Sequence, residues 1–148
     1  YKTGSLVGPS MIKEFLFPYY TALIERIKSR QPRDHHLYIH IDTDGNLQSV
    51  IDWYIDSLGA EVFSPCEVAA GCDVVALGKQ YPHIIFHGGI DKRMLATTPE
   101  QIDRYISAIL PVMRRRGGYY PTCDHMVPEE VSLSNYMFYR KRCIELGG

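Results

Sequence analysis

The stretch LYIHIDTDGNLQSVIDWYIDSLG, residues 37–59, decides the fold class because it joins a short apolar run to a helical repeat. The run Leu37–Ile41 has the length and composition of a buried β-strand. The apolar residues that follow recur at the spacing of one helix face: Leu47, Val50, Ile51, Tyr54, Ile55 and Leu58. Gly59 then stands where helices commonly end in a left-handed glycine. The stretch predicts a strand followed by a helix.

The same alternation continues along the rest of the chain. Further strands are predicted at residues 61–64, 84–87 and 119–120, and further helices at residues 73–80, 99–116 and 134–146. Asp73 and Thr98 have the positions of N-caps. A preceding amphipathic helix over about residues 10–30 should be kinked or split by Pro18. Four βα units after a helix predict an α/β fold with a parallel sheet, either open and doubly wound or a segment of a (β/α)8 barrel.

Size and composition limit the function classes. The 148 residues suffice for one domain, 1–148, and contain 45% hydrophobic and 22% charged residues, which is ordinary globular composition. The net charge of -1 predicts no nucleic-acid partner, and no apolar run is long enough for a membrane span. The basic triplet Arg114–Arg116 fits a helix C-terminus better than a phosphate site. Four cysteines without a C-x-x-C pair predict free thiols and a cytoplasmic protein.

Polar and titratable residues follow each of the four predicted strands, at the end where both architectures bind their ligands. In chain order they are His40, Asp42 and Asp44; Cys66 and Glu67; His87, Gly88, Gly89, Asp91, Lys92 and Arg93; and Cys123, Asp124 and His125. Simpler alternatives exist for several of them. Asp44 fits a turn, His40 fits a hydrogen-bonded core position, and the glycine pair fits either a tight turn or a close approach to a ligand. His125 is the strongest single candidate for a functional residue.

Five short motifs follow one another along the chain: Gly8-Pro9-Ser10, Phe17-Pro18-Tyr19, His40 to Asn46, Gly88-Gly89-Ile90-Asp91 and Asp124-His125-Met126-Val127-Pro128. Their order resembles that of the C-terminal half of the uroporphyrinogen decarboxylase superfamily. The chain resembles that superfamily over nearly its whole length. The resemblance implies the second half of a (β/α)8 barrel, so that residues 1–148 form a single partial domain of a longer enzyme.

One branch of the superfamily removes carboxyl groups from a tetrapyrrole without a cofactor. For this chain it implies a carboxy-lyase acting on a tetrapyrrole or a related carboxylated small molecule. His125 and Asp42 would be the catalytic residues, with His125 in proton transfer or substrate orientation. Asp44, His87, Gly88, Gly89 and Arg93 would contact the substrate, although Arg93 also fits a solvated position at a helix start. Such a half of the enzyme is expected to be inactive alone.

The other branch is similar to the cobamide-dependent methyltransferases, which hold zinc with a His-x-Cys and a later Cys. Here His40-Ile41-Asp42 matches with Asp in place of Cys, and Cys123 resembles the later Cys. This alternative implies zinc bound by His40, Asp42 and Cys123, with Glu67 as a possible addition, and a corrinoid partner. A third alternative, from a different class, is a non-catalytic domain with a vestigial pocket.

Four strands cannot close a barrel of eight. We therefore expect both sheet edges to be open, the helices to lie on one side, and a large apolar face to remain uncovered. The N-terminal half or a second copy of the chain would cover that face, which predicts a homo-oligomer when the first half is absent.

Overall fold

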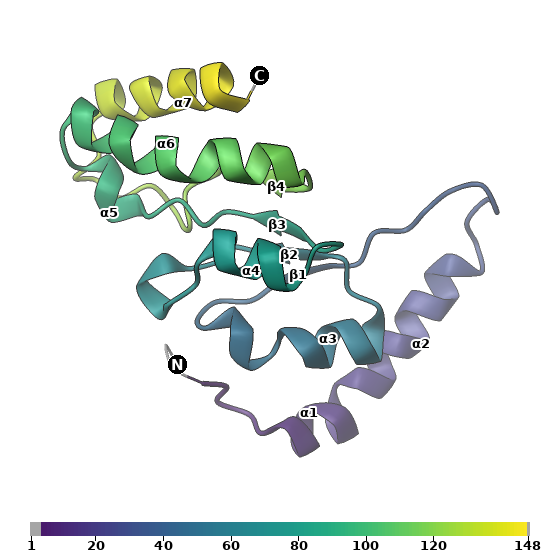
Figure 1. The fold of residues 1–148 in the computed structure, drawn as a ribbon. Helices are drawn as coiled ribbons and strands as arrows, with labels where there is room; N and C mark the ends of the chain where they lie inside the picture. Colours follow the sequence, from purple (N-terminus) through teal and green to yellow (C-terminus); the bar gives the residue numbers. More distant parts are fainter. Residues whose placement is uncertain (1–3, 148) are drawn as a thin grey trace.

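The protein, described here over residues 4–147 by a computed structural model, alternates strands and helices as predicted (Figure 1). Residues 1–3 and 148 of the predicted domain lie outside the described range. Two short 3-10 helices lie at Leu47–Ser49 and Val68–Ala70. The other elements are α1 (Pro9–Phe15), α2 (Phe17–Lys28), β1 (His40–Asp42), α3 (Ile51–Leu58), β2 (Val62–Ser64), α4 (Val74–Gln80), β3 (Ile85–His87), α5 (Lys92–Leu95), α6 (Pro99–Arg116), β4 (Tyr119–Tyr120) and α7 (Leu133–Gly147).

The four strands form one parallel sheet in the order β1-β2-β3-β4. A doubly wound sheet would reverse its strand order at a switch point, whereas the strands of a (β/α)8 barrel follow one another in chain order. The observed order is therefore consistent with a partial barrel-like α/β fold. The first strand is shorter than predicted: pairing with β2 begins at His40, and residues 37–39 lie outside the strand.

One face of the sheet is packed against helices. Ile41, Phe63, Phe86 and Tyr119 stand in register across all four strands. Phe63 and Phe86 are fully buried in a core that α3, α4 and α6 complete with Ile51, Val74, Leu77 and Met113. This apolar layer fixes which side of each strand faces the helices, since successive side chains point to opposite faces.

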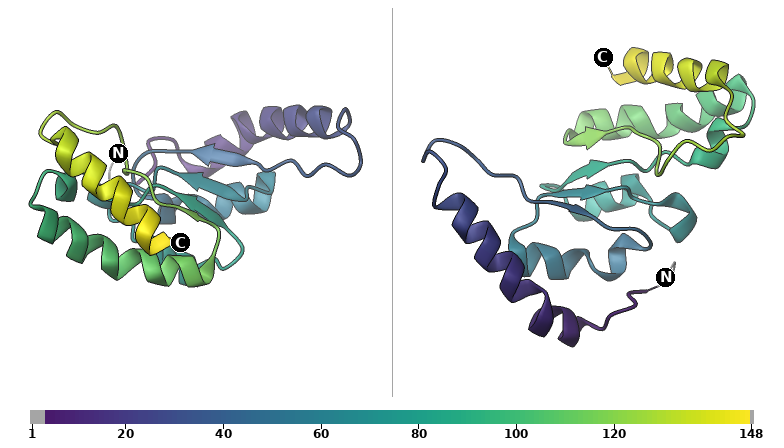
Figure 2. Two further views of the ribbon diagram at one scale, coloured as in Figure 1. Left: turned by 90° about the horizontal axis from the view of Figure 1, so that it is seen from above. Right: turned by 180° about the vertical axis from the view of Figure 1, so that it is seen from behind.

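The other face of the sheet is polar, which corrects the prediction of a large uncovered apolar face. It carries His40, Asp42, Ser64, His87 and Tyr120, beside Val62 and Ile85. In the view from behind, the strands lie in front of α4 with no helix of residues 4–147 crossing them (Figure 2). Asp42, Ser64, His87 and Tyr120 are the last residues of the four strands, so the polar side chains of this face gather at the carboxyl end of the sheet.

Several local signals in the sequence act as predicted. The N-terminal helix is split before Pro18, with α1 ending at Phe15 and α2 beginning at Phe17. Gly59 ends α3 in the left-handed conformation with φ of 66°. Asp73 caps α4 by accepting hydrogen bonds from two backbone N–H groups, and a full capping box opens α6. At the other end of α6, Arg116 donates to the carbonyls of Gly117 and Gly118, as expected for a basic helix C-terminus.

The helices α1 and α2 pack against α3 on one side and expose several large apolar side chains on the other. Ile12 and Phe17 anchor these helices against α3. Met11, Phe15, Tyr19, Leu23 and Ile27 remain exposed. Neither these helices nor any other in residues 4–147 has the length and apolar character needed to cross a membrane.

Candidate functional site

A hollow of about 620 Å³ opens at the carboxyl ends of the strands, and we call it the strand-end hollow. Its lining includes Asp42, Asp44, Ser64, His87, Cys123 and His125. These residues come from β1 and the loop after it, from β2, from β3 and from the loop after β4. The structure therefore brings together most of the predicted site residues, although they are distant in the sequence.

His125 and Asp44 face each other across the strand-end hollow. Nε2 of His125 lies 3.4 Å from Oδ1 of Asp44, and their side chains are 40% and 55% exposed. The pair is an ion pair when the imidazole is protonated. Because both groups are reachable from solvent, the ring can exchange protons with water and can also meet a bound substrate.

A second polar cluster lies on the sheet itself. Nε2 of His40 lies 2.9 Å from Oγ of Ser64, within hydrogen-bonding distance. The ring of His87 stands 6.1 Å from that of His40 and 6.1 Å from that of Tyr120, measured between centroids. Imidazole and hydroxyl groups thus continue from the strand-end hollow onto the uncovered face, where they can donate and accept hydrogen bonds.

The predicted zinc ligands His40, Asp42 and Cys123 are not assembled as a metal site. Within residues 4–147, no three His, Cys, Asp or Glu side chains gather closely enough to hold a metal ion. Nε2 of His40 is already engaged by Ser64. Burial raises the pKa of the Cys123 thiol, which disfavours the thiolate that binds zinc. Glu67, the proposed addition, accepts a hydrogen bond from the backbone N–H of Gly45 instead.

The protein's own packing already requires glycine at positions 88 and 89, while their role as substrate contacts stays a prediction. A Cβ at Gly88 would stand 1.8 Å from the carbonyl oxygen of Pro65, and one at Gly89 would stand 2.1 Å from Cγ1 of Val74. Both residues also have positive φ, of 104° and 71°. The close approach that requires glycine here is made by the β2 loop and by α4.

Arg93, also predicted to contact substrate, is paired with Asp91. Nε and Nη2 of Arg93 donate to the two carboxylate oxygens of Asp91 at 2.9 and 2.7 Å. Burial alone would raise the pKa of Asp91, but the hydrogen bonds from the Arg93 side chain and backbone lower it overall. The guanidinium therefore has a partner within its own loop, and it does not line the strand-end hollow.

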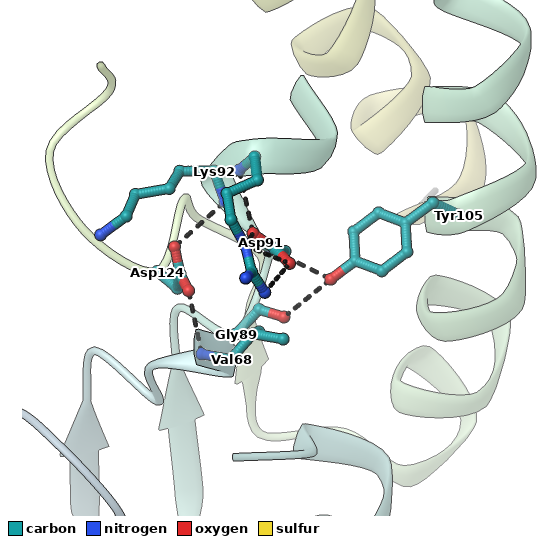
Figure 3. Close-up of polar contacts among 7 residues, drawn as sticks. Val68, Gly89, Asp91, Lys92, Tyr105 and Asp124 are labelled. Atoms are coloured by element: carbon teal, nitrogen blue, oxygen red, sulfur yellow. Dashed lines mark hydrogen bonds and ion pairs between the residues drawn. The ribbon is translucent and has the colours of Figure 1, made fainter. Parts of the chain in front are cut away.

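Asp124 is the residue whose role the sequence analysis missed. Its side chain is fully buried, and its two oxygens accept hydrogen bonds from the backbone N–H groups of Val68 at 2.9 Å and Lys92 at 3.1 Å (Figure 3). Val68 follows β2 and Lys92 follows β3, so one carboxylate joins three strand-end loops. The only sequence signal was an acidic residue directly before His125, and nothing local reveals which N–H groups it meets.

Tyr105 supports the same loops from α6. Its hydroxyl accepts from the backbone N–H of Asp91 at 3.0 Å and donates to the carbonyl of Gly89 at 3.5 Å (Figure 3). Burial raises the pKa of Tyr105 to about 12, so the hydroxyl keeps its proton at neutral pH and can fill both roles. The loop after β3 is thus held from one side by Tyr105 and from the other by Asp124.

A polar hollow beyond the carboxyl ends of a parallel sheet is the place where α/β enzymes bind their ligands, and this chain has an α/β fold with a polar hollow at that place. The chain belongs to the uroporphyrinogen decarboxylase family, as the sequence motifs predicted, because the sequence model of that family matches residues 2–145. It is 20% identical over 127 residues to a uroporphyrinogen decarboxylase of Hydrogenobaculum sp. (strain Y04AAS1). That match covers 86% of this chain and 34% of the relative, so the chain spans about a third of the relative's length.

Proposed function

We propose that this chain forms the second half of a (β/α)8 barrel in a carboxy-lyase, and that the complete protein decarboxylates a tetrapyrrole or a related carboxylated small molecule. The observation that supports this most is the pair His125 and Asp44, which meets over the strand-end hollow. Family membership supports the reaction class. We assign the remaining catalytic groups to the part of the protein that precedes this chain.

In the proposed step, the bond between a substrate carbon and its carboxylate breaks and CO2 leaves. The electron pair stays on the carbon, which then takes a proton from the imidazolium of His125. Neutral His125 regains a proton from water, which its partial exposure allows. Imidazole is the side chain that proteins use most often as a general acid and base, so it suits both halves of this cycle. The step consumes one proton, releases one CO2 and requires no cofactor.

Asp42 and His87 are assigned to substrate binding and orientation. Both line the strand-end hollow, and both lie on the polar face of the sheet, Asp42 at the end of β1 and His87 at the end of β3. The carboxylate of Asp42 accepts hydrogen bonds and would suit pyrrole-type N–H groups. The imidazole of His87 can donate to a substrate carboxylate. Asp44 is assigned to the orientation of the His125 ring.

The location proposed for the protein is the cytoplasm. All four cysteines are free thiols, three of them buried, as is usual in a reducing compartment. The proposed partners are a small-molecule substrate and the first half of the barrel, with no nucleic acid. A zinc-dependent methyl transfer with a corrinoid partner has less support, because the three ligands it needs do not converge.

The test is a decarboxylation assay on the full-length protein that contains this chain. Uroporphyrinogen, kept reduced under anaerobic conditions, is the first substrate to try, with mass spectrometry to detect stepwise loss of CO2. The expected result is product formation that requires His125, with His125→Ala and His125→Gln as the matched variants. No CO2 release from uroporphyrinogen or from a panel of pyrrole carboxylates would contradict the proposal.

A further inference from the structure

We propose that Asp124 is the positioning residue of the strand-end hollow: its buried carboxylate locks the loops after β2, β3 and β4 together and thereby holds His125 against Asp44. The inference deepens the proposed function and rests on it for the catalytic role of His125. The locking itself is argued from contacts that do not depend on the reaction.

The surroundings of Asp124 are those of an anion held by backbone N–H groups. The side chain is fully buried, and both of its partners are main-chain donors from different loops. Within residues 4–147 it takes part in no salt bridge. A carboxylate without hydrogen bonds is costly to bury, so a movement of any of these loops that breaks one of the two bonds is disfavoured.

The backbone of Asp124 adds a third tie. Its N–H donates to the carbonyl of Ile90 at 2.8 Å, and the N–H of Ile90 donates to the carbonyl of Thr122 at 3.2 Å. The loop after β4 is therefore fixed to the loop after β3 on both sides of Cys123. His125 follows directly, and its ring reaches across to Asp44 in the loop after β1. Any shift of Asp124 would be transmitted to His125 through a single peptide unit.

The loop after β1 is fixed independently. The backbone N–H of Gly45 donates to Oε2 of Glu67, and the side-chain amide of Asn46 donates to the carbonyl of Ala70. Glu67 directly precedes Val68 and Ala70 follows it by two residues, and the N–H of Val68 donates to Asp124. Asp44 and His125 are thus both tied to the loop after β2: Asp44 through the bond from Gly45 to Glu67, and His125 through the bond from Val68 to Asp124. This common reference is what sets the 3.4 Å separation of the pair.

Two kinds of variant remove the lock with little change in volume. Asp124→Asn keeps the shape, but an amide has one acceptor oxygen, so its NH2 group must oppose one of the two N–H donors. Val68→Pro removes one donor and leaves the carboxylate intact. Proline suits this position because Val68 is the first residue of a helical turn and Glu67 before it is extended, with φ of -62° and ψ of 111°. Val68→Ala keeps the N–H and is the matched control for Val68→Pro.

The first measurement is kinetic and uses the full-length protein. A catalytic group misplaced by about 1 Å can cost about 100-fold in rate, so Asp124→Asn should lower kcat by that order and leave KM nearly unchanged. Val68→Pro should lower kcat in the same direction, while Val68→Ala and Asp73→Asn should stay within about twofold of wild type, since a side-chain change away from the lock leaves the loops in place. Asp73 is a second carboxylate that accepts from two backbone N–H groups, and it caps α4 without lining the strand-end hollow.

The second measurement needs no substrate. In NMR spectra of the folded protein, Asp44→Ala should move the ring signals of His125, because the two side chains face each other. The same substitution should leave those signals unmoved in the Asp124→Asn and Val68→Pro backgrounds. A response to Asp44→Ala that persists in both backgrounds would overturn the inference, as would unchanged kcat. Loss of the response in a protein that releases no CO2 would support the lock and refute the decarboxylase.

Discussion

His125 and Asp44 follow the two outermost strands of the sheet, yet their side chains stand 3.4 Å apart. Neighbouring strands are separated by about 4.8 Å, so the outer two of four strands would lie about 14 Å apart in a flat sheet. The loops after β1 and β4 close this gap by reaching toward each other at the carboxyl end of the sheet, where both contribute to the lining of the strand-end hollow.

Replacement of His125 should separate its catalytic and structural roles. His125→Ala and His125→Gln are expected to lower turnover of the full-length protein by about 100-fold or more, because a general acid contributes that order of rate. The melting temperature should hardly change, since the ring is 40% exposed and its ion pair with Asp44 is open to solvent. Parallel thermal melts and turnover assays measure both effects. Unchanged turnover would return His125 to a structural role.

Gly88 should be far less tolerant of substitution than Gly59, although both have positive φ. Gly88→Ala would place a Cβ 1.8 Å from the Pro65 carbonyl oxygen, whereas a Cβ at Gly59 meets nothing within 4 Å. We expect Gly59→Ala to cost about 1 kcal/mol of unfolding free energy, and Gly88→Ala to cost more than about 3 kcal/mol or to prevent folding. Urea unfolding of the two variants checks this. Equal costs would show that the turn at Gly88 can relax.

The pair of Asp91 and Arg93 should make stability depend on acid pH. Because the pKa of Asp91 is lowered in the folded protein, its stabilising effect is present above the unfolded value of about 3.9 and is lost as pH falls through the folded value. Asp91→Asn should therefore cost about 1 kcal/mol at pH 7 and nothing at a pH below the folded pKa. Unfolding curves at several pH values measure this. A pH-independent difference would contradict it.

Zinc should not depend on His40 and Cys123. Nε2 of His40 is bound to Ser64, and no three-ligand group is formed within the described residues. Protein purified without chelator and its His40→Ala/Cys123→Ala double variant should therefore contain the same amount of zinc by plasma emission. Stoichiometric zinc that disappears in the double variant would revive the methyltransferase alternative.

The exposed apolar side chains of α1 and α2 should drive association of residues 1–148 when they are expressed alone. Tyr19 and Leu23 are 75% and 53% exposed, which is unusual for side chains of this size on a stable surface. Tyr19→Glu with Leu23→Glu should convert self-associated protein to monomer in light scattering at high concentration. Arg26→Glu on the same helix is the control for a change of charge. A wild-type chain that is already monomeric would contradict this prediction.

Much of the fold could be predicted because its signals are local. The split at Pro18, the cap at Asp73 and the end of α3 at Gly59 each depend on a few neighbouring residues. The start of β1 could not be predicted in this way. Residues 37–39 are as apolar as a strand, but the residue pairs of β1 and β2 begin at His40, and Ile39 contributes its carbonyl oxygen, which accepts from the N–H groups of Glu61 and Val62.

The candidate site divides along the same line. The sequence could show that Asp42, Asp44, His87 and His125 lie at one end of the sheet, where they line the strand-end hollow, because the carboxyl ends of parallel strands meet at one edge. The sequence could not show which side chains bond to one another across different loops. The ion pair of Arg93 with Asp91 depends on the side-chain conformation within one loop. The two hydrogen bonds of Asp124 depend on contacts with segments that are far away in the sequence.

The in-register rows across the sheet also limit how the chain can change in length. Ile41, Phe63, Phe86 and Tyr119 occupy the row that faces the helices, and the residue after each faces the other side or ends the strand. Deletion of a single residue within β2 would turn Phe63 toward solvent and Ser64 toward the helices, since strand side chains alternate. We therefore expect insertions and deletions to be tolerated in the loops rather than in the strands, because in each strand the residue that faces the helices is followed directly by one on the polar face.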